Sequence, residues 1–166
     1  LSSVLWIPIL FMPGRLLRNI RRKYICFFTS HWACMVLSLA GIKVKTEGKQ
    51  NIPDDSRFVI VSNHQGNTDI PVYMCFFNDP LSFIAKKELL YFPFINIWLL
   101  LLECIPINRK KPFKARGKIE RGLKKDQHYP LVLFPEGTRS KGEDMRLFKS
   151  LGLKAAFDAG KTILPI

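Results

Sequence analysis

The sequence predicts an α/β domain with a central mixed sheet flanked by helices, preceded by amino-terminal membrane-associated helices. Short apolar runs rich in β-branched residues recur along the chain with helical segments between them, which is the pattern of an α/β sheet. The first 41 residues differ, because they are apolar and basic and contain no Asp or Glu. We therefore expect a membrane-associated helical region over residues 1–41 and a sheet domain over residues 42–166, and 166 residues suffice for one domain with a substantial core.

The amino-terminal region alternates between uncharged and basic segments. Residues 1–14 carry no charge, five Lys and Arg residues follow within residues 15–23, and the 19 residues of 24–42 are again uncharged. A membrane-spanning helix needs about 20 apolar residues, and this last segment only just reaches that length and contains Thr29, Ser30 and other polar residues. Spanning the membrane, lying in its interface and packing as helices of a soluble protein all stay open. The basic flank favours membrane association with the active site facing the cytoplasm.

The chain is both strongly basic and strongly apolar. Its 26 Lys and Arg residues and 13 Asp and Glu residues give a formal net charge of +13, while 48% of all residues are hydrophobic. The apolar content excludes a disordered basic tail. An anionic membrane surface, a nucleic acid and an acidic lipid-like substrate are the partners that suit this combination. Because the sequence has no recognised nucleic-acid-binding signature, we expect no nucleic acid partner.

Six short segments are expected to form strands. Residues 42–46 alternate between apolar and charged side chains, which is the period of a half-buried strand. The other five are short apolar runs, typical of strands buried in a sheet. They lie at residues 57–62, 81–85, 104–107, 131–134 and 162–166. Because the chain starts without Met and stops inside the last run, we expect the sheet domain to be incomplete at its carboxyl end.

Four segments between these strands are expected to form helices. One of them, residues 112–127, places Ala115, Ile119 and Leu123 on one face. The stretch from 109 to 125 holds nine Lys and Arg residues and one acid. This charge fits either a solvated helix face or a surface that faces phosphate groups. The four expected helices are residues 69–77, 91–102, 112–127 and 148–159.

The four cysteines show neither a CxxC pair nor the spacing of metal ligands. Their neighbours are apolar, and four cysteines in 166 residues is an ordinary content. We therefore expect small buried hydrophobic residues in a reducing compartment, with neither a disulfide nor a metal. These residues are Cys26, Cys34, Cys75 and Cys104.

Two polar segments directly follow predicted strands, which is where α/β sheets place their sites. The first is NHQGNTD at residues 63–69. Its Asp69 can accept a hydrogen bond from Nδ1 of His64, and such a carboxylate fixes the tautomer of a histidine that acts as a general base. A core histidine beside an aspartate that caps a helix is the alternative interpretation. The chain has no GxSxG segment, so a covalent acyl-enzyme is not indicated.

The second polar segment is FPEGTRS at residues 134–140. It offers a carboxylate, hydroxyls and a guanidinium around a glycine that permits a tight turn, and a guanidinium binds phosphate bidentately. Arg109 follows another predicted strand in the same way. A polar turn would explain this segment alone, but a His–Asp pair and two arginines at one sheet edge suit attack by a hydroxyl of a phosphorylated substrate. The candidate residues of the segment are Glu136, Gly137, Thr138 and Arg139.

The segments NHQGNTD, INR, FPEGTRS and LPI, in this order, resemble the glycerolipid acyltransferase family. The H-x4-D motif of that family matches at His64 and Asp69, and its FPEGTRS motif matches without a gap. Residues 83–89 are similar to the stretch that precedes the family's second motif. The resemblance covers residues 41–166, and the amino-terminal region is similar to the family's membrane-binding helices in character only.

The resemblance implies transfer of an acyl chain from acyl-CoA or acyl carrier protein to the sn-2 hydroxyl of lysophosphatidate, giving phosphatidate in phospholipid synthesis. It implies that His64 is the general base and that Asp69 orients it. It also implies that no metal or bound cofactor takes part, and that the partners are membrane lipids, lysophosphatidate and the acyl donor. The residues that it places at the substrate are Arg109, Glu136, Gly137, Thr138, Arg139 and Lys86.

In that scheme the two arginines hold the phosphate, Glu136 and Gly137 position the glycerol, and Lys86 adds positive charge. The uncharged run 89–102 is a candidate lining for the acyl chain, although core packing would explain it equally well. The family's second motif differs here at Glu103 and Pro106, where Gly and Phe are usual. Glycerol 3-phosphate or another lysophospholipid as acceptor, and a non-catalytic peripheral membrane protein, therefore stay open as alternatives.

Overall fold

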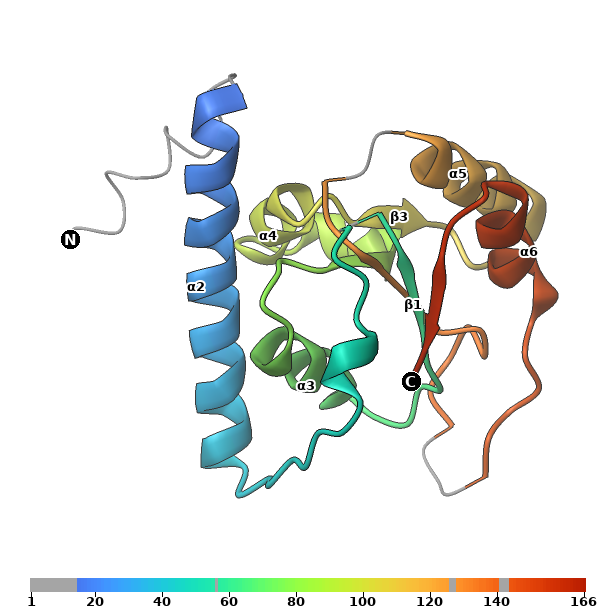
Figure 1. The fold of residues 1–166 in the computed structure, drawn as a ribbon. Helices are drawn as coiled ribbons and strands as arrows, with labels where there is room; N and C mark the ends of the chain where they lie inside the picture. The colour runs from blue at the N-terminus through green and yellow to red at the C-terminus, as the bar shows by residue number, and fades with distance from the viewer. Residues whose placement is uncertain (1–14, 56, 126–127, 141–143) are drawn as a thin grey trace.

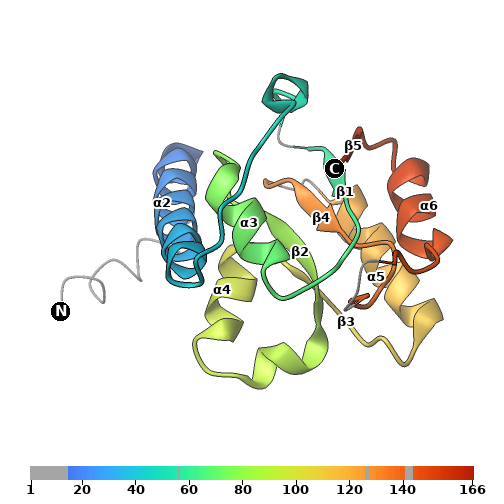
Figure 2. The ribbon, with the colours of Figure 1, turned by 90° about the horizontal axis from the view of Figure 1, so that it is seen from below.

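Five parallel strands form one sheet in the order β3–β2–β4–β1–β5 (Figures 1 and 2). The computed structural model describes residues 15–55, 57–125, 128–140 and 144–166. The chain passes from β1 to β2 and β3 in one direction, then returns to place β4 between β2 and β1 and β5 beyond β1. The strands are β1 (Val59–Val61), β2 (Ser82–Lys86), β3 (Ile105–Ile107), β4 (Leu131–Leu133) and β5 (Ile163–Pro165).

Helices cover both faces of this sheet (Figures 1 and 2). One face carries α3 and α4, with α2 packed outside α3, and the opposite face carries α5 and α6. Helices change face where the direction of travel through the sheet reverses, as right-handed crossovers require. The helices are α2 (Arg15–Leu39), α3 (Asp69–Phe76), α4 (Ile95–Leu101), α5 (Pro112–Lys124) and α6 (Ser150–Asp158), with 3-10 turns η2 (Lys49–Asn51) and η3 (Lys87–Tyr91).

The core consists of two apolar layers, one on each face of the sheet. Ile60 of β1 and Val132 of β4 point into the layer that contains α3 and α4. The layer that contains α5 and α6 receives the alternate residues of the same strands, Val59 and Val61 of β1 and Leu131 and Leu133 of β4. Strands buried on both faces must be apolar at every position, which explains why β1 and β4 read as continuous apolar runs. The predicted face of α5 is confirmed, since Ala115, Ile119 and Leu123 are all buried.

Three expectations about the fold are wrong. The sheet is not mixed, because all four strand pairings of the described residues are parallel, and a helix connects each strand to the next along the chain. Residues 42–46 form no strand, since this segment runs from α2 toward the sheet without a pairing partner among the described residues. The predicted helix 91–102 is divided into η3 and α4, where Phe94 has a φ of 65° just after Pro93.

Helix α2 has two distinct faces. Residues spaced by four, Ile25, Thr29, Ala33 and Leu37, are buried, and the Thr29 hydroxyl donates to the Ile25 carbonyl at 2.8 Å. The other side exposes large apolar residues, among them Phe27, Trp32, Met35 and Leu39. None of the helices in the described part of the chain is both long and apolar enough to cross a membrane. The first apolar segment, 1–14, lies outside the described residues.

A disulfide links α2 to α3. Cys34 and Cys75 are bonded, with their Cα atoms 5.0 Å apart. The expectation of four unpaired cysteines is therefore wrong for these two, which meet only because α2 packs along α3. The other two remain thiols, and burial raises the pKa of Cys26 and raises that of Cys104 to about 12.

The same substitution at two glycines of α5 is expected to have opposite effects on the free energy of unfolding. A Cβ on Gly122 would lie 2.5 Å from Cδ1 and 3.0 Å from Cγ1 of the buried Ile105, whereas one on Gly117 would meet nothing within 4 Å. Gly122→Ala should therefore lower the free energy of unfolding by about 1 kcal/mol, because overpacking outweighs the gain in helix propensity. Gly117→Ala, the matched control, should raise it by about 0.5–1 kcal/mol. Urea unfolding measures both, and equal gains would show that β3 and α5 are not packed as described.

Candidate active site

His64 lies in the loop after β1, at the carboxyl edge of the sheet. Its backbone N–H donates to Oε1 of Glu136 at 2.8 Å, although the two residues are 72 positions apart. Its ring stacks on Phe134, with centroids 4.1 Å apart and planes 16° apart. The residue is only 8% exposed, so backbone and ring are both held by the loop that follows β4.

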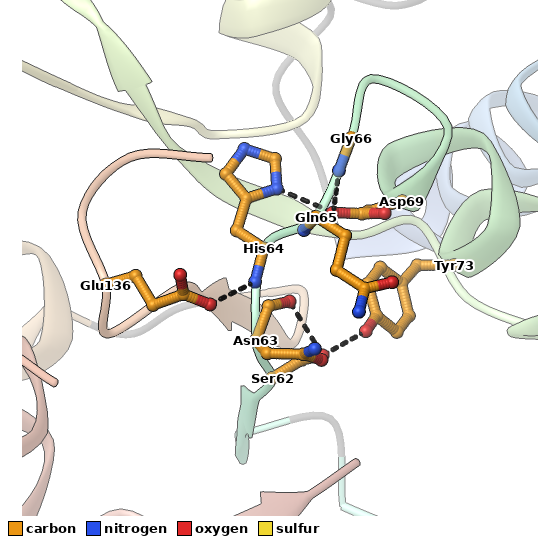
Figure 3. A network of polar contacts seen from close by, with 8 residues as sticks. All are labelled: Ser62, Asn63, His64, Gln65, Gly66, Asp69, Tyr73 and Glu136. Atoms are coloured by element: carbon orange, nitrogen blue, oxygen red, sulfur yellow. Dashed lines mark hydrogen bonds and ion pairs between the residues drawn. The ribbon is translucent and has the colours of Figure 1, made fainter. Parts of the chain in front are cut away.

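The predicted His–Asp pair is formed (Figure 3). Nδ1 of His64 donates to Oδ2 of Asp69 at 2.7 Å. The same oxygen accepts the backbone N–H groups of Gln65 at 2.9 Å and Gly66 at 3.1 Å. Asp69 begins α3, so the helix start and three donors fix its carboxylate. With the proton on Nδ1, a neutral His64 carries a lone pair on Nε2, which points away from Asp69.

Glu136 connects the two polar loops and is 1% exposed. Its Oε1 accepts the N–H of His64, and its Oε2 accepts the N–H of Arg146 at 3.2 Å. A further bond, from the N–H of Ser140 to the carbonyl of His64 at 2.8 Å, joins the same loops. The peptide groups on both sides of the His64 Cα are therefore fixed by the FPEGTRS segment.

Tyr73 contacts the first polar loop at its start. Its hydroxyl donates to Oγ of Ser62, the last residue before the NHQGNTD segment (Figure 3). Burial raises the pKa of Tyr73, the Ser62 bond partly offsets this, and the negative charge of Asp69 raises it further. Tyr73 therefore stays a neutral donor at physiological pH.

A cavity of about 160 Å³ opens beside His64. Most of its wall is apolar and comes from the strand ends and from α5 and α6. The charged residues of the wall are Arg109, after β3, and Lys149, before α6, and no carboxylate belongs to the described lining. A second cavity of about 520 Å³ lies between α2 and the segment after α3, and its His31 and Asp79 contact the Phe27 carbonyl and Arg22, respectively. The apolar wall of the cavity beside His64 includes Ile84, Ile107, Ala115, Ile119, Leu133 and Leu151.

The structure separates the other predicted residues into two groups. Arg109 and Gly137 line the cavity. Thr138, Arg139 and Lys86 do not belong to its wall, and the last two are exposed. The backbone of Arg139 nonetheless lies close to His64, because the N–H of the next residue, Ser140, donates a hydrogen bond to the His64 carbonyl.

The uncharged run 89–102 contributes no residue to the cavity wall. Part of it is core, as Leu101 and Leu102 are buried, and part is surface, as Tyr91 is 80% exposed and Phe94 is 79% exposed. The apolar lining comes instead from residues dispersed over three strands and two helices. Such a set has no local signal in the sequence, because only the packing of these elements assembles it.

Lys149 is a cavity residue that the sequence reasoning did not assign. The only signal for it was its place in a segment, Phe148–Lys149–Ser150–Leu151, that is similar to a family stretch after FPEGTRS. Among the residues that the structure describes, no three His, Cys, Asp or Glu side chains are grouped as a metal would need.

The arrangement combines three chemical features in one place. His64 presents a base with an orienting carboxylate, Arg109 and Lys149 supply positive charge, and the remaining wall is apolar. A base of this kind removes a proton from a hydroxyl, and the cations suit an anionic group close to that hydroxyl. The site therefore suits an amphipathic anionic substrate with a reacting hydroxyl.

The comparisons with known proteins all indicate the same family. A family model described as Acyltransferase matches residues 43–166. The chain is 36% identical to a 1-acyl-sn-glycerol-3-phosphate acyltransferase of Borreliella burgdorferi over 81% of this chain and 55% of that protein. It is 34% identical to a protein of the same name from Pseudomonas aeruginosa, over 99% of this chain and 65% of that one. The chain thus spans about half to two thirds of the length of these curated relatives.

A solved structure has the same fold. It is the crystal structure of a 1-acyl-sn-glycerophosphate (LPA) acyltransferase, PlsC, from Thermotoga maritima. The TM-score is 0.77 at 28% identity, over 99% of this chain and 64% of that chain. The likeness therefore extends over α2 as well as over the sheet domain.

The contacts of Glu136 predict a large loss of stability when its carboxylate is removed. Glu136→Ala leaves the buried N–H of His64 and the partly buried N–H of Arg146 without their acceptor, so the free energy of unfolding should fall by at least about 2 kcal/mol. Glu120→Ala is the matched control, since it removes only a surface pair with Arg116 on α5 and should have a far smaller effect. Denaturant unfolding measures both, and equal effects would contradict the linking role of Glu136.

Proposed function

This chain belongs to the acyltransferase family, and from that membership we propose that it transfers an acyl chain to the sn-2 hydroxyl of lysophosphatidate, forming phosphatidate in phospholipid synthesis. The observation that carries the proposal is the cavity in which the Asp69-oriented His64 meets cations and an apolar wall. The names of the relatives support the choice of acceptor. The donor is a thioester, either acyl-CoA or acyl carrier protein.

In the proposed reaction, Nε2 of His64 takes the proton of the sn-2 hydroxyl as its oxygen attacks the thioester carbonyl. The negative charge of Asp69 stabilises the imidazolium that forms. The tetrahedral intermediate collapses, the C–S bond breaks, and the imidazolium returns the proton to the leaving thiolate. His64 thus acts first as a base and then as an acid, and neither a metal nor a bound cofactor is needed.

The acceptor is held by its charge and by its backbone. We assign the phosphate to Arg109 in the cavity wall, with Arg139 and Lys86, which lie outside that wall, adding positive charge. Gly137 lines the cavity, so its backbone can approach the glycerol, with Thr138 next to it. Glu136 contributes indirectly, because both carboxylate oxygens are occupied by backbone N–H groups.

We also propose that α2 attaches the protein to the cytoplasmic side of a membrane. Its exposed side carries large apolar residues opposite the face that packs on α3, and Arg18 and Lys23 are exposed near its start. A helix with such a side lies in the membrane interface, where basic residues contact anionic headgroups.

His64→Ala should lower kcat at least about 100-fold, because it removes the general base. The measurement is thiol release from acyl-CoA by the protein on anionic liposomes, with lysophosphatidate, glycerol 3-phosphate or lysophosphatidylcholine as acceptor. Release that needs both lysophosphatidate and His64 supports the proposal. Release with another acceptor changes the substrate and keeps the reaction, and acyl carrier protein donors are tested if acyl-CoA gives none. An active His64→Ala variant, or a wild type inert with every donor, would refute the proposed chemistry.

The membrane proposal predicts that a charge on the exposed side of α2 weakens binding. Trp32→Asp should lower the partition coefficient onto anionic vesicles about tenfold, since roughly 1.4 kcal/mol of apolar burial is lost. Phe157→Asp on α6 is the matched control, because Phe157 is also an exposed aromatic residue but lies on the far side of the sheet from α2. Cosedimentation measures both, and equal losses would show that α2 is not the binding surface.

A further inference from the structure

Lys149 lies in the cavity wall together with His64 and Arg109. The backbone fixes its position at the start of α6, where the N–H of Lys149 donates to the carbonyl of Pro135 at 2.8 Å. Pro135 and Gly137 line the same cavity. The backbone of Lys149 is therefore tied to the turn of the FPEGTRS segment, and its exposed side chain lies at the edge of the cavity.

The side chain of Lys149 lies across Gly137. A Cβ on Gly137 would be 3.3 Å from Nζ and 3.4 Å from Cδ of Lys149, so the absence of a side chain at this turn leaves the room that the lysine occupies. Gly137 also has a φ of +69°, which an L residue rarely adopts. The turn thus both requires glycine and brings the ammonium group to the mouth of the site.

The charges around the cavity favour an anion as the partner of Lys149. Within the described part of the chain no carboxylate pairs with Lys149, and the only other charged residue of the lining is Arg109, also a cation. The two come from separate elements, the end of β3 and the start of α6. Both are exposed cations that line one space with no described acid in its wall, so an anion that binds there meets both positive charges.

We propose that Lys149 binds a phosphate group of the substrate together with Arg109, an inference that rests on the proposed function. Both lysophosphatidate and the acyl donor carry phosphate. The acceptor is the better match, because its phosphate is on the carbon next to the reacting hydroxyl, and both cations share a cavity with His64. In the donor, the whole pantetheine arm separates the phosphate from the thioester.

The kinetic test is Lys149→Met, with KM measured separately for acceptor and donor. The acceptor KM should rise about tenfold with kcat little changed, which corresponds to roughly 1.4 kcal/mol. Lys149→Arg should restore most of the affinity, because a guanidinium also binds phosphate. Lys154→Met is the matched control, since Lys154 is exposed on the same helix and does not line the cavity. A rise in the donor KM alone would assign Lys149 to the donor phosphate, and no rise in either KM, or a fall in kcat alone, would overturn the proposal.

A binding measurement separates this claim from the proposed reaction. In the His64→Ala background no turnover is needed, and Lys149→Met should weaken binding of lysophosphatidate about tenfold. Monoacylglycerol, which lacks the phosphate, should bind equally with and without Lys149. Equal weakening for both ligands would show a merely structural role, whatever acceptor the wild type uses.

Discussion

The contact between the His64 backbone and the buried carboxylate of Glu136 is the one on which the rest of the site depends. It joins loops that are 72 residues apart, and a second bond between Ser140 and His64 runs in the opposite direction. A buried carboxylate that accepts hydrogen bonds from backbone N–H groups holds the two loops in one relative position. Any shift would leave the buried charge or an N–H group without a partner. The orientation of the His64 ring is therefore set by the FPEGTRS loop as well as by Asp69.

That contact exists because the sheet order places β4 beside β1. All strands are parallel, so the loops after them emerge at one edge, and the two polar loops become neighbours. Arg109 follows β3 at the same edge, and Lys149 reaches it from the start of α6. The long polar insert between β4 and α6 thus serves a structural purpose, since it carries both the carboxylate that fixes His64 and the lysine that faces the cavity.

The sequence predicted those features of the fold and the site that depend on local patterns of residues. The buried strands, the amphipathic face of α5 and the H-x4-D spacing depend on neighbours in the chain, and the structure agrees with them. The prediction of a strand at 42–46 was wrong, because alternating apolar and charged residues form a strand only where a second strand pairs with them. The Cys34–Cys75 bond and Lys149 in the cavity depend on how distant elements pack, so no spacing rule could find them. The resemblance placed Glu136 at the substrate, and the structure adds that its buried carboxylate accepts the backbone N–H groups of His64 and Arg146, contacts that no local pattern predicts.

The distribution of acids explains how a chain of net charge +13 keeps a cavity open to an anion. Four acids of the described residues have internal partners: Asp69 with His64, Glu136 with backbone groups, Asp79 with Arg22, and Glu103 with Arg21 and His128. Others, such as Glu47, Asp55 and Glu120, pair with cations at the surface. None of these acids belongs to the described lining of the cavity, whose charged residues are the cations Arg109 and Lys149. An anionic group that enters there meets positive charge without a competing carboxylate in the described wall, next to the base that acts on its neighbouring hydroxyl.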